Sequence, residues 1–133
     1  MTKTARIKER PRAPHLTIYR WSITMAMSIA HRITGVALYF GIILLAIWLT
    51  SVACGDEAFK MINGIYGSMP GLCILFFYTL VGVHHMVGSI RHIVWDIKPC
   101  LLMKEKATLT AWATVFISFI VTIIIWIIGY SVV

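Results

Sequence analysis

Three long apolar stretches constrain this chain more than any other feature of its sequence. They cover about residues 22–51, 70–95 and 109–133 of the 133. Each is longer than the roughly 20 residues that cross a bilayer core as an α-helix. With 59% hydrophobic and 13% charged residues, a chain of this length could not bury its apolar surface in water. The sequence therefore predicts an all-α protein with three transmembrane helices.

The basic residues predict how these helices are oriented. The formal charge is +7, and Lys and Arg gather in residues 1–21 and in the connection between the second and third stretches. The first connection, from Cys54 to Gly71, carries Asp56 and Glu57 against Lys60 and is rich in glycine, which is typical of a loop. Positive charge favours the cytoplasmic side, or the mitochondrial matrix. We expect a basic inner segment over 1–21, a membrane domain over 22–133, and no nucleic-acid partner.

Polar residues that are costly in lipid interrupt the first stretch. Ser28, His31 and Arg32 stand three or four positions apart, so they are expected to share one helical face. Arginine in a membrane span costs from about 2.5 to well over 10 kcal/mol by different estimates, and ionisable groups there normally face the bundle interior. By helical rise, Ser28 lies about 9 Å and Arg32 about 15 Å below the inner surface.

The second stretch has a similar set near its inner end: His84, His85, Ser89, Arg91 and His92. Counted back from the end of the helix, Arg91 lies about 6 Å and His85 about 15 Å deep. The polar groups of both helices therefore occupy the same half of the membrane. Matching depths predict one shared site in the bundle interior.

Two kinds of ligand suit such a site. Imidazole binds haem iron, Gly88 or Ser89 lets the flat macrocycle approach the helix, and arginine with histidine suits the propionates. Ser28 and Arg32 could instead hydrogen-bond the carbonyl of a quinone, which is an apolar body with polar ends. The plainer alternatives are histidines that hydrogen-bond helix to helix and end residues that extend toward lipid headgroups.

A small transporter or channel is a further alternative. It would need polar residues that continue through the outer half of the membrane. The third stretch offers only Ser118 and Thr122, so no conducting path is visible. The residues alone favour a membrane cofactor protein and do not select the cofactor.

Two motifs resemble those of the cytochrome b membrane-anchor subunits of succinate dehydrogenase, respiratory complex II. The stretch "RPRAPHLTIYRWSITMAMSIAHRITGVAL" contains the pattern Ser-x-x-His-Arg-x-Ser/Thr at Ser28, His31, Arg32 and Thr34. The stretch "HHMVGSIRHIVWD" matches His-x-x-x-Gly-x-Arg-His, with an Asp four residues further on, at His85, Ser89, Arg91, His92 and Asp96. Both motifs lie in order on the expected helices, and the resemblance covers nearly the whole chain.

The resemblance implies a role for each site residue. His85 would be an axial ligand of a haem b iron, shared with a second membrane subunit, and His84 is the alternative ligand. Ser28 and Arg32 would bind ubiquinone. Haem propionates would lie near His31, Arg91 and His92.

The resemblance also implies partners and a location. The chain would anchor an iron-sulfur subunit and a flavoprotein subunit, together with a second small anchor, in a bacterial inner membrane or, alternatively, a mitochondrial one. It would carry electrons from succinate oxidation to quinone without binding succinate and without activity alone. A fumarate reductase anchor and a haem-free structural anchor are the alternatives.

The chain departs from the family pattern at two places. Arg12 and Ala13 replace a Leu-Ser pair near the N-terminus. Ser89 stands where the family usually has glycine, and Gly88 lies one position earlier. The spacing to Arg91, His92 and Asp96 selects His85 over its neighbour as the ligand.

Overall fold

The computed structural model describes residues 20–132, and within this range the chain is almost entirely helical. The elements in order are α1 (Ile23–Cys54), α2 (Asp56–Tyr66), α3 (Met69–Ile97), the 3₁₀ turn η1 (Pro99–Leu102) and α4 (Lys104–Val132). Three of these helices, α1, α3 and α4, are long and apolar enough to cross a membrane. The all-α prediction with three membrane-spanning helices is therefore confirmed. The basic residues of the N-terminal segment up to Arg12 lie outside the described residues.

Local chemistry sets where two of the long helices begin. The Ser22 side chain accepts a hydrogen bond of 3.3 Å from the Met25 amide, which caps α1. Ser68 accepts one of 3.3 Å from the Gly71 amide, and a proline follows in the first turn of α3. Such caps satisfy amides that have no partner within the helix. The starts predicted from the apolar pattern, residues 22 and 70, fall within one residue of the first helical residues, Ile23 and Met69.

The first connection differs from its prediction, because it contains a helix rather than a loop. The acidic first turn of α2 suits the positive end of the helix dipole. Its Phe59 ring lies 6.4 Å from the Trp48 ring, and the Tyr66 hydroxyl donates a 2.7 Å hydrogen bond to the Leu44 carbonyl. Glycine and asparagine predict a loop locally, but packing against α1 overrides that preference. Among the residues that the structure describes, Gly55 alone has a positive φ, 101°, a conformation that glycine allows.

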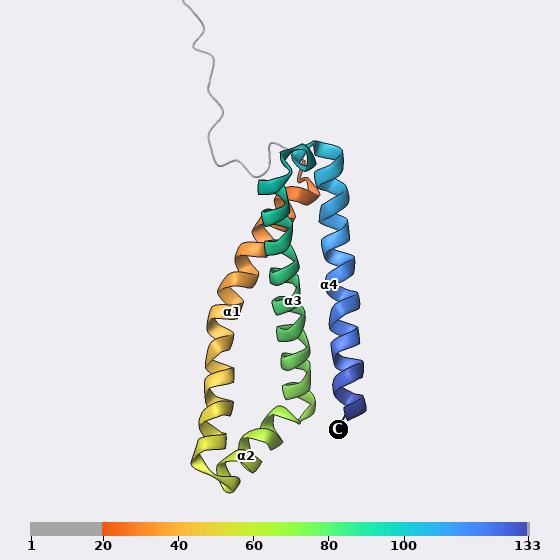
Figure 1. The fold of residues 1–133 in the computed structure, drawn as a ribbon. Helices are drawn as coiled ribbons and strands as arrows, with labels where there is room; N and C mark the ends of the chain where they lie inside the picture. The colour runs from red at the N-terminus through yellow and green to blue at the C-terminus, as the bar shows by residue number, and fades with distance from the viewer. Residues whose placement is uncertain (1–19, 133) are drawn as a thin grey trace, which may run out of the picture.

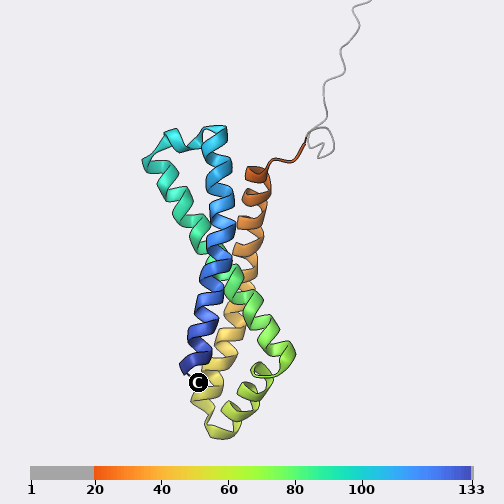
Figure 2. The ribbon, with the colours of Figure 1, turned by 90° about the vertical axis from the view of Figure 1, so that its right-hand side faces the viewer.

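The chain runs back and forth along one axis. In Figure 1 the start of α1 lies at the same end as η1, whereas α2 and the C-terminal end of α4 lie toward the other end. Figure 2 shows α3 crossing the other two long helices obliquely. Accordingly α3 packs against both α1 and α4, which also touch each other. The two connections therefore lie at opposite ends of the bundle.

Small side chains on α4 form the largest share of the buried interior in the described part of the chain. The buried residues of this helix recur at spacings of three and four: Ala107, Ala111, Thr114, Ser118 and Thr122. Small residues allow helices to approach closely in a membrane, where packing rather than the hydrophobic effect holds them together. Most large apolar side chains are exposed. Such a surface is suited to lipid and to neighbouring membrane helices. The helix begins at Lys104 rather than at the predicted residue 109. The prediction followed the apolar stretch, and the charged first turn of the helix lies outside that stretch.

Candidate functional site

A cluster of histidines lies between α1 and α3. The rings of His31 and His85 stack with centroids 4.1 Å apart and an interplanar angle of 15°. The ring of a third histidine, His92, stands roughly edge-on to His31, with the ring centroids 5.2 Å apart. His31 Nε2 is 3.2 Å from the Ser89 hydroxyl. The structure thus brings together polar residues that the sequence placed at matching depths on two helices.

The contacts of His85 define which of its ring nitrogens is available. Its Nδ1 lies 3.2 Å from the His31 carbonyl oxygen and 3.2 Å from the Thr34 hydroxyl. A carbonyl can only accept, so this geometry assigns the proton to Nδ1. Within the described residues no hydrogen bond involves Nε2 of His85. A neutral imidazole held in this way presents a lone pair on Nε2, which is the form that binds a metal.

Two glycines make the close approach of these rings possible. A Cβ on Gly35 would lie 3.1 Å from Cε1 of His85, and a Cβ on Gly88 would lie 2.7 Å from Cδ2 of His31. Each histidine therefore lies against a glycine of the opposite helix. The departure from the family pattern has a physical reason, because Gly88 admits the His31 ring while Ser89 hydrogen-bonds its nitrogen.

The adjacent His84 points to the other side of α3. Its Nδ1 lies 3.3 Å from the hydroxyl of Ser118 on α4. That hydroxyl donates to the Thr114 carbonyl at 2.7 Å, so its oxygen accepts a hydrogen bond from the Nδ1–H of His84. Because neighbouring residues on a helix are turned by about 100°, the two histidines serve different interfaces. Of these two neighbours, His85 belongs to the cluster with His31 and His92, and His84 does not.

Arg91 is the most unusual residue of the interior. It is 7% exposed, and its Nε and Nη1 atoms are buried without a hydrogen-bond partner. The guanidinium carbon lies 4.7 Å over the ring of Trp95, whose own Nε1 is also buried and unpaired. An aromatic face stabilises a cation but does not satisfy its N–H donors. Buried donors of this kind are suited to an anionic group.

Ser28 and Arg32 lie apart from the histidine cluster. Ser28 is half-buried, whereas Arg32 is exposed on α1. Among the described residues, Arg32 makes no hydrogen bond or ion pair. The sequence predicts one shared helical face for Ser28, His31 and Arg32. In the structure His31 turns toward α3, whereas Arg32 turns outward. Arg32 is therefore available to a group outside this chain.

Sequence reasoning underestimated two residues of the site. Thr34 entered only as part of a motif, although its hydroxyl touches His85. Trp95 is the last residue of the predicted second stretch, at the membrane boundary. In the structure its ring lies beneath the Arg91 guanidinium, and its centroid is 5.2 Å from that of the His92 ring. The three-residue spacing from His31 to Thr34 and the four-residue spacing from Arg91 to Trp95 were the available signals.

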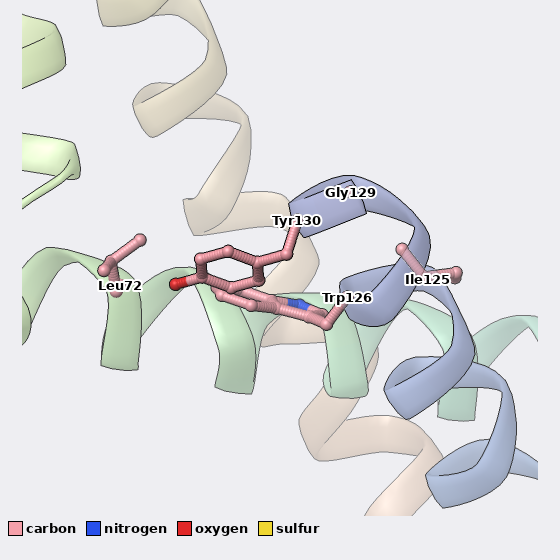
Figure 3. Close-up of a pocket in the computed structure, with 5 residues that line it drawn as sticks. All are labelled: Leu72, Ile125, Trp126, Gly129 and Tyr130. Atoms are coloured by element: carbon pink, nitrogen blue, oxygen red, sulfur yellow. The ribbon is translucent and has the colours of Figure 1, made fainter. Parts of the chain in front are cut away.

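An apolar groove of about 420 Å³ lies elsewhere in the bundle (Figure 3). It is lined by Leu72 of α3 and by four residues near the end of α4, which are Ile125, Trp126, Gly129 and Tyr130. By helical rise, Leu72 is about 20 Å along α3 from His85. None of the lining residues belongs to the histidine cluster, so the groove is separate from that site.

Together these observations define a class of protein: a multi-pass membrane subunit whose helix interface carries stacked imidazoles and a buried, unpaired guanidinium. Residues 6–125 match the model of the succinate dehydrogenase/fumarate reductase transmembrane subunit family. The chain belongs to this family.

Similar proteins come from bacteria and from mitochondria. The succinate dehydrogenase cytochrome b556 subunit of Rickettsia bellii is 35% identical over 129 residues, covering 96% of this chain and all of that protein. The cytochrome b560 subunit of Reclinomonas americana is 36% identical and covers 90% of this chain and 85% of that protein. The mitochondrial b560 subunit of Mus musculus is 36% identical over 72% of this chain and 58% of its own length. With three spanning helices, the chain is a multi-pass inner-membrane protein.

Proposed function

We propose that this chain is the cytochrome b membrane anchor of a succinate dehydrogenase, in which it holds haem b and ubiquinone and docks the flavoprotein and iron-sulfur subunits. The family match and the names of the relatives support the membrane subunit of complex II. Electrons from succinate would reach quinone at this subunit. The chain itself would bind no succinate and would be active only within the assembled complex.

The donor set fits a haem b. His85 has its proton on Nδ1, bonded to the His31 carbonyl, and its Nε2 is available as an axial ligand. The second axial ligand would come from a companion membrane subunit, because His84 is turned to Ser118 on the far side of α3. When bound, the haem would supply a one-electron carrier of adjustable potential.

Cationic residues of the cluster fit the haem propionates. Arg91 has two buried N–H groups without partners, and a carboxylate would satisfy them. His92 contacts both Trp95 and His31 and would lie beside the same group. The Ser89 hydroxyl donates to the His85 carbonyl and accepts from Nε2 of His31, so His31 would reach a propionate only through an Nδ1–H.

Ser28 and Arg32 would form the quinone site of this chain. Both lie outside the histidine cluster, and the exposed Arg32 can reach a ligand bound between this chain and its partners. A guanidinium there would donate to a quinone carbonyl and stabilise the negative charge that develops during reduction. Ser28, one turn earlier, would add a neutral donor.

The ends of the bundle support a docking side for the soluble subunits. The start of α1 and the α3–α4 connection lie together at one end (Figure 1), and Lys98, Lys104 and Lys106 belong to that connection or to the first turn of α4. The opposite connection has Asp56 and Glu57. Because positive residues favour the inner face, we assign the basic end to the cytoplasm or matrix. Ser28 and Arg32 lie nearer to this end.

The observation that carries the proposal is the orientation of His85, with Nδ1 bonded and Nε2 available. The test is a reduced-minus-oxidised optical spectrum of the complex purified in mild detergent. We expect a b-type band in the native complex that is lost in His85→Leu and kept in the matched His84→Leu variant. A band that survives in His85→Leu would refute the ligand assignment. A native complex with no band would refute haem binding and leave a haem-free anchor.

A further inference from the structure

Three polar atoms around His85 form a closed triangle. Nδ1 of His85 is 3.2 Å from the His31 carbonyl oxygen and 3.2 Å from Oγ1 of Thr34. Thr34 Oγ1 is in turn 2.9 Å from the same His31 carbonyl oxygen. The two oxygens come from consecutive turns of α1, whereas the imidazole comes from α3.

The donors and acceptors of this triangle can be assigned from chemistry. The carbonyl oxygen has two lone pairs and only accepts. The Thr34 hydroxyl donates its one proton to that carbonyl, which leaves its oxygen free to accept. The Nδ1–H of His85 therefore points between two acceptors. A Nδ1 atom without its proton would face the carbonyl lone pairs, which is unfavourable.

We propose that Thr34 is a positioning residue for His85: its hydroxyl fixes the ring tautomer and rotation, and through them the ligand strength of Nε2. The inference rests on the proposed function, since it deepens the role of His85 as the axial ligand. A hydrogen bond at Nδ1 makes the opposite nitrogen a stronger electron donor. Stronger donation favours the oxidised metal, so Thr34 lowers the potential of a group bound at Nε2.

The backbone alone would hold the ring less firmly. The His31 carbonyl is a single acceptor, and rotation of the imidazole about its χ2 torsion is broad for sp³–sp² bonds. The second acceptor at Thr34 restricts that rotation. Gly35, directly after Thr34, removes the side chain that would otherwise press on Cε1 of His85 at 3.1 Å. Consecutive residues of α1 thus give the ring one preferred position.

The test compares Thr34→Val, which keeps the shape but removes the hydroxyl, with Thr34→Ser, which keeps the hydroxyl. Thr110→Val is the matched control, because Thr110 also donates to the carbonyl three residues earlier, at 3.1 Å, and is half-buried in α4. Each variant is purified as the whole complex. The measurements are haem content, the haem midpoint potential by redox titration, and the low-spin electron paramagnetic resonance spectrum, which reports ligand-plane orientation.

We expect Thr34→Val to shift the midpoint potential upward, broaden or move the low-spin signal, and weaken haem retention about tenfold or more. Thr34→Ser should restore all three toward native values, and Thr110→Val should leave them unchanged. A Thr34→Val complex with native potential and signal would overturn the proposal. Haem that survives in His85→Leu would instead refute the ligand assignment, and the role of Thr34 would fail with it. Haem loss in His85→Leu together with a native potential in Thr34→Val would overturn the role of Thr34 alone.

Discussion

The clearest steric prediction concerns the contact between Gly88 on α3 and the ring of His31 on α1. In Gly88→Ala the new methyl would lie 2.7 Å from Cδ2 and 3.4 Å from Nε2 of His31. Ordinary contacts between carbon atoms are about 3.5–4.0 Å. The ring must therefore retreat by about 1 Å, because the methyl group is fixed to the helix backbone.

The cost of that movement can be estimated from the contacts that it disturbs. Overpacking costs about 1–3 kcal/mol. The retreat also stretches the 3.2 Å bond between His31 Nε2 and the Ser89 hydroxyl beyond hydrogen-bond range, which adds about 0.5–1.5 kcal/mol. Against this, alanine favours a helix over glycine by about 1 kcal/mol. We expect Gly88→Ala to destabilise the bundle by about 1–3 kcal/mol, a roughly 5- to 150-fold change in the unfolding equilibrium.

The assay is reversible unfolding of the purified complex in mild detergent, followed by far-ultraviolet circular dichroism. Gly129→Ala is the control, since a Cβ there meets nothing within 4 Å and should cost nothing. A double-mutant cycle with His31→Ala isolates the clash, because the penalty of Gly88→Ala should disappear once the ring is gone. An undiminished penalty in the His31→Ala background, or native stability in Gly88→Ala, would refute the steric argument.

Three further predictions test other contacts. Gly41→Ala would place a methyl inside the space of the Tyr78 ring, so it should destabilise the complex by about 1–3 kcal/mol in a thermal melt, and Tyr78→Ala should relieve that penalty. Arg91→Leu removes an unsatisfied buried cation, so the melting temperature of the haem-depleted complex should be no lower than that of the native one. Haem titration should show an affinity reduced about 10- to 100-fold, and native haem affinity would contradict the propionate role. Arg32→Leu should slow quinone reduction about tenfold or more in a steady-state assay with normal haem content, and unchanged turnover would exclude Arg32 from the quinone site.

Sequence patterns predicted the membrane-spanning elements well because the signal for them is local. Apolar runs of sufficient length specify a helix in lipid, where every backbone group needs a partner within the helix. The α2 helix was missed since its stability depends on Tyr66 and Phe59 packing against α1, which local composition cannot report. Helix ends were predicted within a residue where a serine cap marked them, and less well at Lys104, where charged residues extend the helix beyond the apolar stretch.

The polar residues show the same division. Their depth follows from counting residues along two helices, so the sequence could place them at one level of the membrane. Their direction depends on how α3 rotates and crosses its neighbours. That rotation turns His85 to the Thr34 side of α1 and His84 to Ser118 of α4. Motif spacing selected His85 by resemblance, and the packing supplies the geometric reason.

By itself, the sequence determined the number of spanning helices, the membrane setting and the set of polar residues available inside it. These properties depend on composition and on the fixed rise of a helix. Only the tertiary structure decided that His31 and His85 stack and that Arg91 is buried with unsatisfied donors. It also decided that Gly88 makes room for the His31 ring while Ser89 hydrogen-bonds the Nε2 atom of that ring. Those outcomes depend on side-chain contacts between helices far apart in the chain, whose crossing angle and rotation no single segment encodes.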